Sequence, residues 1–468
     1  MKEYDIVIVG AGPGGSTAAK EAAEKGLKTI FFERGRKPGE KNSSGCGLGP
    51  RLWREFDIMK ELNSKDCPSM RPGAAARNYF INAEGEVTGY VMTRPTESVT
   101  YEPAKSMITM NCYRSDFDPW LAKFAVEAGA KLKTSTLVTS LLKEDGRVVG
   151  VIDEKGEKYK GFVIGADGAV SMVARESGLR QRWGQQETTL TLQYDFECSS
   201  SKIDDIMGDE ALAVWWSATF PACYQVFFDS SFHLGLGNWM TWWDKNPVHY
   251  LNKVVNLKYM QRLLRVLDAK PREFQAHLLP WQGMPHKTHT ENMLLVGDAG
   301  GFPCPLEAEG IYPAMVTARA AVETAAEAIS VGDTSKEFLS LYDEKWMATS
   351  VGDDFKSGPE LQSIWMALPF SPRKSMSWFV PMLMEILGGI IDWSEPHPVR
   401  IRQVARRIKQ YLPQFVPFLL KEVIPLLTSA LGEDKIELLT NPQKLLTEMP
   451  EIGEAITKAF TPDDSEED

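Results

Sequence analysis

A run of glycines near the amino terminus has the spacing of a phosphate-binding loop. It reads GxGxxG and lies between an expected strand, residues 5–9, and an expected helix, residues 16–25. Glycines at this spacing allow a tight turn and let the backbone approach a pyrophosphate, which then meets the free N–H groups of the helix. The candidate binding residues are Gly10, Gly12, Gly14 and Gly15.

Glu33 is a candidate ligand for the sugar of the same molecule. It follows the next expected strand, residues 28–32, where a carboxylate can accept hydrogen bonds from a ribose hydroxyl. Strand, glycine turn, helix and strand together predict a βαβ unit that binds a dinucleotide. The motif alone does not distinguish FAD from NAD.

The composition and charge exclude several classes of protein. The chain has 468 residues, 43% of them hydrophobic and 25% charged, as is typical of a globular protein. Its net charge of −11 argues against nucleic acid as a partner. No CxxC, HxxxH or HxxE spacing occurs, so we expect no metal site. The amino terminus lacks the pattern of a secretion signal, which predicts a cytoplasmic protein with reduced thiols.

The elements that must position these residues alternate along the chain. We expect a helix over 116–128 capped by Ser115, and a β-rich antiparallel region over 181–281. The uncharged stretch 211–228 contains Pro221, which favours sheet strands over a membrane-spanning helix. The other expected elements are strands at 131–142, 148–153, 162–165 and 293–296, a helix at 312–330, and further helices beyond 333.

Two further segments resemble signatures of the large group of flavoproteins with two dinucleotide folds. Residues 165–171 are similar to its GADGxxS element, and residues 294–300 are similar to its second FAD signature. The resemblance implies FAD as the cofactor, and the chain has no second GxGxxG for a separate NAD(P)H domain. The cofactor-binding residues that it implies here are Asp167, Gly168, Gly297, Asp298, Gly310 and Ile311.

Within that group, the chain resembles the geranylgeranyl reductase and FixC branch, which is related to electron-transfer-flavoprotein:quinone oxidoreductases. The resemblance rests on the run after Glu33, the Gly-Cys-Gly of residues 45–47, an RxxFDxxL pattern from residue 114, and the serine and arginine spacing of residues 171–179. It implies four more cofactor-binding residues, namely Arg34, Gly45, Gly47 and Arg114.

The same resemblance singles out Cys46 as the candidate catalytic residue. Reductases of this branch carry a Cys-Gly pair close to the flavin, which implies a proton donor or a group that shapes the site. Small apolar packing is the alternative for Cys46, and also for Cys304. Two acids, Glu307 and Glu309, precede Gly310, and beside a flavin we expect one of them to be turned away or protonated.

Two apolar regions have alternative interpretations. Five tryptophans in the β-rich region, at positions 215, 216, 239, 242 and 243, form either a wall for a long apolar substrate or ordinary core. Residues 375–427 combine apolar segments with a basic strip between them. This pattern suits peripheral contact with the inner face of a membrane, and a buried helical lid or an oligomer interface is the alternative.

We therefore predict an α/β protein with a doubly wound, glutathione-reductase-like FAD-binding domain, an inserted antiparallel substrate sheet and a helical carboxyl-terminal region. The expected boundaries are 1–180 and 291–332 for the FAD-binding domain, 181–290 for the substrate domain, and 333–468 for the helical region.

The resemblance implies a reductase that passes hydride from reduced flavin to a C=C bond of an apolar, prenyl-like substrate. Its electron donor would be a ferredoxin, an electron-transfer flavoprotein or transiently docked nicotinamide. Three alternatives stay open: a FixC-like dehydrogenase that passes electrons between a flavoprotein and quinone, an FAD-dependent monooxygenase, and a flavin-binding assembly subunit. The departures from the branch are a Cys-Gly context that is not KPCG and the lack of a carboxyl-terminal cysteine cluster, so that any iron–sulfur relay would be a separate chain.

Overall fold

The computed structural model describes most of the chain up to residue 356 and a short part beyond it. The described ranges are 1–40, 46–81, 87–93, 109–217, 223–240, 245–281, 283–305, 308–356 and 412–418, with a few single positions between them. Every structural statement below refers to these residues.

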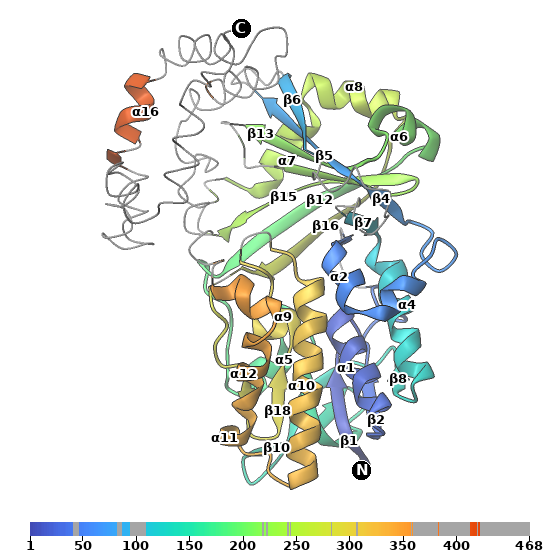
Figure 1. Ribbon diagram of the computed structural model, residues 1–468, viewed down its shortest axis with the longest axis vertical. Coiled ribbons are helices and arrows are strands. Elements are labelled where there is room, and N and C mark those ends of the chain that lie inside the picture. Colours follow the sequence, from blue (N-terminus) through green and yellow to red (C-terminus); the bar gives the residue numbers. More distant parts are fainter. Residues whose placement is uncertain are drawn as a thin grey trace, which may run out of the picture.

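A parallel sheet forms the half of the molecule that contains the amino terminus (Figure 1). Its central strand β1 (Lys2–Val9) pairs in parallel with β2 (Thr29–Phe32) and with β11 (Lys158–Gly165). β18 (Met293–Leu295) lies beyond β11, and β8 (Lys131–Lys133) lies beyond β2. Strands from four distant parts of the chain therefore end at one edge of this sheet, next to the glycine loop.

The two faces of this sheet are covered differently. Helices α1 (Pro13–Glu24), α4 (Arg114–Glu127) and α10 (Ile311–Val331) pack on one face through a continuous apolar core (Figure 1). On the other face, β9 (Val138–Glu144) and β10 (Arg147–Asp153) continue antiparallel from β11 and cover a second core. Helices on one face and a β-meander on the other therefore bury both sides of the central strands.

Two expectations for these elements were wrong. Ser115 does not cap the helix but lies in its first turn, because the Phe117 N–H already bonds to the carbonyl oxygen of Tyr113 at 2.9 Å. The expected strand 131–142 is two strands, because Ser135 takes a left-handed backbone with φ 47° that no strand can contain.

A second sheet fills the other half of the molecule, in the order β16-β12-β15-β14-β13-β5-β6 (Figure 1). Its pairs are antiparallel except for the parallel pair β13–β5. The antiparallel region expected over 181–281 is thereby confirmed, and β5 and β6 join it from before residue 94. The strands are β12 (Thr188–Glu197), β13 (Glu210–Ser217), β14 (Cys223–Phe227), β15 (Ser231–Trp239), β16 (Lys270–Pro280), β5 (Ala75–Ile81) and β6 (Val87–Thr93).

One face of the second sheet is apolar and covered by helices, and the other face carries polar groups. Trp215 is fully buried, stacks on Tyr79 with ring centroids 4.3 Å apart, and belongs to the apolar core together with the partly buried Trp243. Trp216 points to the opposite face and donates to Asn78 Oδ1 at 3.0 Å. These three tryptophans therefore do not form one wall. The covering helices are α6 (Ser200–Met207), α7 (Pro247–Val255) and α8 (Lys258–Val266).

Short elements connect the two sheets and follow α10. The connecting ones are β3 (Cys46–Leu48), β4 (Arg71–Gly73), β7 (Thr109–Cys112), α2 (Pro50–Glu55), a 3₁₀ helix (Asp57–Glu61), α5 (Met172–Glu176), β17 (His289–Thr290) and α9 (Gly297–Gly300). The later helices are α11 (Lys336–Leu339), α12 (Leu341–Met347) and α16 (Leu412–Phe418).

The apolar region 375–427 lies almost entirely outside the described residues. Among the residues that are described, no helix has the length and hydropathy needed to span a membrane.

Candidate cofactor and substrate site

Two glycines of the glycine loop pack closely against backbone atoms, and a third faces an arginine side chain. A Cβ at Gly10, which has φ +102°, would lie 2.3 Å from the carbonyl oxygen of Ala166, and a Cβ at Gly15 would lie 1.9 Å from that of Gly10. At Gly12 the nearest atom to a Cβ would be Arg114 Nη2, at 3.2 Å. Gly12 thus faces a positive charge at the amino terminus of α1, an arrangement that fits a pyrophosphate.

Glu33 lies beside this loop at the end of β2. It is 9% exposed, and its Oε1 accepts a hydrogen bond from the Gly35 N–H at 2.7 Å. Burial raises the pKa of Glu33, while the N–H groups of Gly35 and Ala11 and the charge of Arg34 act in the opposite direction. The carboxylate is thus oriented by backbone groups, as a ribose ligand must be.

Arg114 forms a two-pronged ion pair with Asp118, one turn later in α4. Its Nε and Nη2 lie 2.5 Å and 2.7 Å from the two carboxylate oxygens, and the Asp118 side chain is fully buried. The sequence marked Asp118 only as part of a motif, and its spacing of four residues from Arg114 was the available signal. The pair fixes the guanidinium against Gly12.

Asp298 lies where α9 and α10 meet, and a strand of the second sheet reaches it. A Cβ at Gly310, the residue before α10, would lie 3.1 Å from Asp298 Oδ1. Burial raises the pKa of Asp298, and His277 and Arg114 oppose that rise. Burial lowers the pKa of His277 in β16, and the negative charge of Asp298 opposes that fall. His277 was missed from the sequence because a lone histidine in a strand gives no motif.

Glu309 is one of the two acids expected near the flavin. Its Oε1 accepts hydrogen bonds from the N–H groups of Ile311, at 2.7 Å, and Tyr312, at 3.0 Å, so its charge faces the amino terminus of α10. Cys304, which is buried, donates its backbone N–H to the Glu309 carbonyl oxygen at 2.7 Å. Glu307 lies outside the described residues.

Asp167 contributes its backbone rather than its carboxylate to the glycine loop. Its Oδ1 accepts from Ser171 Oγ at 2.6 Å and its Oδ2 from the Val173 N–H at 3.0 Å, so that the carboxylate caps α5. A Cβ at Gly10 would lie 3.2 Å from the Asp167 Cα, and Gly168 follows with φ +78°. The loop after β11 thus lies against the glycine loop.

The predicted cysteine site is described only in its backbone. Cys46 in β3 pairs with Cys112 in β7, and a Cβ at Gly47 would lie 3.0 Å from Thr109 Oγ1. The Cys46 side chain and the whole of Gly45 lie outside the described residues. The structure therefore places the strand but leaves the role of Cys46 a prediction.

A buried polar cluster lies on the face of the second sheet opposite to the covering helices. Asp195 in β12 pairs in register with His233 in β15 and with Glu273 in β16. His233 is fully buried, and its Nδ1 lies 3.9 Å from Asp195 Oδ1. Burial lowers the pKa of His233 to about 3, so the ring is neutral at pH 7 and forms no ion pair.

This cluster predicts a pH-dependent stability. Burial raises the pKa of Asp195 to about 7, the Glu273 charge acts in the same direction, and Arg272 opposes it. When the pKa of an acid is higher in the folded than in the unfolded protein, protonation of that acid stabilises the folded state. This stabilisation is complete below the unfolded-state pKa and is lost as the pH rises through the folded-state pKa. We expect the stability to fall by on the order of 2–4 kcal/mol between pH 4.5 and pH 8.

Urea unfolding of wild type and Asp195→Asn across this pH range measures the effect. The asparagine variant should have a much flatter profile. The exposed carboxylate Asp205 of α6 supplies the matched control, because Asp205→Asn should retain the wild-type slope. Equal slopes for wild type and Asp195→Asn would show that Asp195 is ionised throughout.

Comparison with known proteins places the chain among flavin-binding proteins. The sequence profile of a family described as "FAD binding domain" matches residues 3–350. The digeranylgeranylglycerophospholipid reductase of Methanocella arvoryzae is 29% identical over 353 residues, which are 73% of this chain and 82% of the relative. A second such reductase, from Methanothermobacter thermautotrophicus, is 30% identical over 358 residues, 74% of this chain and 83% of the relative.

Solved structures show the same fold at lower identity. A geranylgeranyl bacteriochlorophyll reductase-like protein from Thermoplasma acidophilum matches with a TM-score of 0.70 and 21% identity, covering 89% of this chain and all of that one. A flavin-dependent brominase matches with a TM-score of 0.59 and 16% identity, covering 88% of this chain and all of its own.

Proposed function

The chain belongs to the FAD-binding family of the digeranylgeranylglycerophospholipid reductases and is an FAD-dependent oxidoreductase, and on that premise we propose that it reduces a C=C bond of an apolar, prenyl-like lipid. The observation that carries the proposal is similarity to reductases of such lipids over about three quarters of the chain. His277 in β16 lies within electrostatic reach of Asp298, so the edge of the second sheet could border a substrate site beside the cofactor.

The residues of the site would mainly hold the cofactor. FAD, when bound, supplies the hydride. The glycine loop and Arg114 would hold its pyrophosphate, Glu33 a ribose hydroxyl, and Asp298 with the entrance of α10 the remainder. The loop after β11 would close the site on the side of Gly168. We also propose that this domain has the doubly wound, glutathione-reductase-like fold.

The electron supply and the location also belong to the proposal. A ferredoxin or an electron-transfer flavoprotein would reduce the flavin, because the chain carries one GxGxxG and that loop serves FAD. Residues 375–427 would hold the protein at the inner face of a membrane, where its lipid substrate is found.

Anaerobic reoxidation of the flavin tests this function against its rivals. The protein is reduced with dithionite, and a geranylgeranyl lipid or a menaquinone analogue is added separately. Reoxidation by the prenyl lipid with a saturated product is the expected result. Reoxidation by quinone alone would instead identify a FixC-like electron-transfer dehydrogenase, and oxygen consumption driven by NADPH and an aromatic substrate would identify a monooxygenase.

Cys46→Ala tests the residue that the family resemblance singles out. As a proton donor, Cys46 would contribute to the rate without holding the cofactor, so we expect turnover to fall about 100-fold at an unchanged flavin content. Single-turnover reoxidation by the prenyl lipid, together with the flavin absorbance, measures both quantities. Turnover equal to wild type would assign Cys46 to packing.

A further inference from the structure

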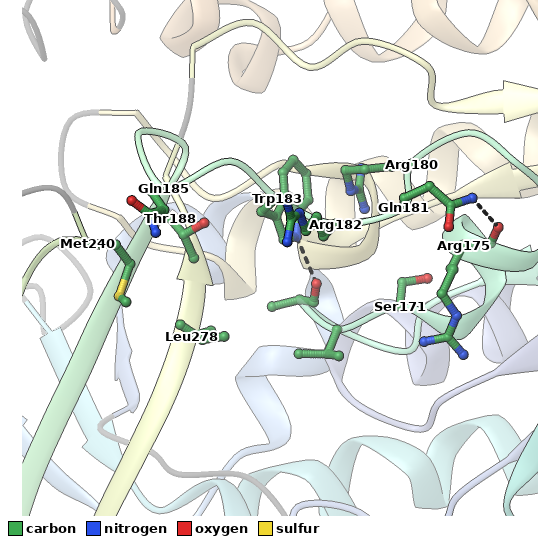
Figure 2. A pocket seen from close by; sticks show the side chains of 12 residues that line it. Ser171, Arg175, Arg180, Gln181, Arg182, Trp183, Gln185, Thr188, Met240 and Leu278 are labelled. Carbon is green, nitrogen blue, oxygen red and sulfur yellow. Dashed lines mark hydrogen bonds between the residues drawn. The ribbon is translucent and has the colours of Figure 1, made fainter.

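A cavity of about 290 Å³ opens beside the cofactor site, between the loop after β11 and the end of the second sheet (Figure 2). It is lined by residues 169–171 of that loop, by the segment that leads into β12, and by Met240 and Leu278 from the sheet. Arg180, which lines the cavity, donates to the carbonyl oxygen of Ala299 in α9, the residue that follows Asp298. The cavity is therefore next to the site at which substrate and cofactor would meet.

Three arginines line this cavity, Arg175, Arg180 and Arg182. Over the part of the chain that the structure describes, none of the three forms an ion pair with a carboxylate, although the whole chain carries a net charge of −11. The charges of Asp167 and Glu187 act on Arg180 without forming an ion pair with it. A cluster of arginines without ion pairs in an acidic protein attracts an anion. Arginine in particular matches the oxygens of a phosphate through paired N–H donors.

Arg180 is held in place before any ligand arrives. Its guanidinium lies 3.4 Å from the ring centroid of Trp183 and donates to the carbonyl oxygen of Ala299 in α9. Trp183 in turn donates its Nε1–H to the carbonyl oxygen of Ala169 at 2.7 Å (Figure 2). Burial lowers the pKa of Arg180 to about 10, with the charges of Asp167 and Glu187 opposing. A fixed and partly desolvated cation binds an anion at little further cost in conformational entropy.

The rest of the lining combines apolar side chains with the polar residues Ser171, Gln181, Gln185 and Thr188. Val170 is 72% exposed and Leu278 37% exposed, and Met240 lines the same cavity (Figure 2). Pockets that enclose a drug-sized ligand measure roughly 300–1,000 Å³, so a cavity of about 290 Å³ holds a polar headgroup and the first atoms of a chain, not a whole prenyl lipid. Cations beside apolar side chains match the part of an amphiphile at which a charged headgroup joins its apolar chains.

We propose that this cavity binds the phosphate group of a glycerophospholipid substrate, with Arg180 and Arg182 holding the phosphate and Leu278 and Met240 contacting the start of the chains. The inference rests on the proposed function and adds to it a binding site for the headgroup, which makes the headgroup and not only the prenyl chain a determinant of binding. The phosphate of a nicotinamide nucleotide has the same chemistry, so the test must separate the two sources.

Calorimetric titration of the FAD-loaded protein tests the assignment without turnover. The ligands are a short-chain dialkyl glycerophosphate, the matching uncharged dialkylglycerol, and NADP⁺. Arg182→Gln should weaken binding of the glycerophosphate about tenfold, and Arg180→Gln with Arg182→Gln about 100-fold, with dialkylglycerol binding unchanged. Arg265→Gln, an exposed arginine of α8, removes one charge elsewhere and should leave all three affinities unchanged.

Several results would overturn the proposal. They are an unchanged affinity of the variants for glycerophosphate, an equal loss for the charged and uncharged lipids, and a loss confined to NADP⁺, which would assign the cavity to a nucleotide. Arg182 is exposed, so its substitution leaves the fold intact if Arg180→Gln does not. A wild-type protein that binds the glycerophosphate through these arginines but reduces no prenyl lipid would refute the proposed function alone.

Discussion

Gly12→Val should yield a folded protein that has lost its flavin. The valine side chain would occupy the space through which a pyrophosphate approaches the amino terminus of α1, and we expect FAD affinity to fall at least about 100-fold. The fold should survive, because Gly12 has φ −74° and ψ −171°, which valine adopts readily, and its Cβ would meet side-chain atoms and no backbone, namely Arg114 Nη2 at 3.2 Å and Asp118 Oδ2 at 3.9 Å. The ratio of flavin to protein after purification, with titration of the apoprotein, measures the loss.

Gly49 supplies a matched control for this substitution. It precedes α2 as Gly12 precedes α1, has φ −76° and ψ 158°, is followed by a proline, and has no atom within 4 Å of a built Cβ. Gly49→Val should therefore retain flavin. Gly15→Ala would be a poor substitute for Gly12→Val, since its Cβ would lie 1.9 Å from a backbone oxygen and disturb the loop itself. Full flavin retention by Gly12→Val would refute the assignment of this loop to the cofactor.

The parts of the site that are local in sequence could be predicted from it. The glycine loop and Gly310 each lie where a helix begins, and Glu33 directly follows β2, so local spacing predicts their places. Antiparallel strands in the region 181–281 followed from alternating β-branched and aromatic residues. Burial on one face imposes such patterns directly on the sequence.

The parts that depend on distant pairing could not be predicted. His277 reaches the site only because β16 is the edge strand of the second sheet and ends near α9, which no local pattern encodes. β5 joins that sheet by a parallel pairing with β13, more than 120 residues later in the chain. The three cavity arginines lack a motif, and only the packing of Trp183 against Arg180 shows that one of them is fixed.

Arg114→Met should destabilise the protein by about 3–5 kcal/mol, because it removes the two-pronged ion pair of the fully buried Asp118 carboxylate. It should also weaken FAD binding, because it removes the positive charge that faces Gly12. The single variant does not separate these two effects, since a damaged fold also loses its ligand. Unfolding must be compared between apoproteins, because bound FAD itself stabilises the folded state.

The double variant Arg114→Met with Asp118→Leu separates them. Replacing a buried ion pair by apolar groups of similar volume is often neutral, so we expect most of the lost stability to return. FAD affinity should stay low, because the charge beside Gly12 is still missing. Recovery of both stability and affinity would mean that Arg114 serves only to neutralise Asp118, and that the helix amino terminus alone binds the pyrophosphate. Recovery of stability alone assigns the guanidinium to the cofactor, which is the role that its place against the glycine loop implies.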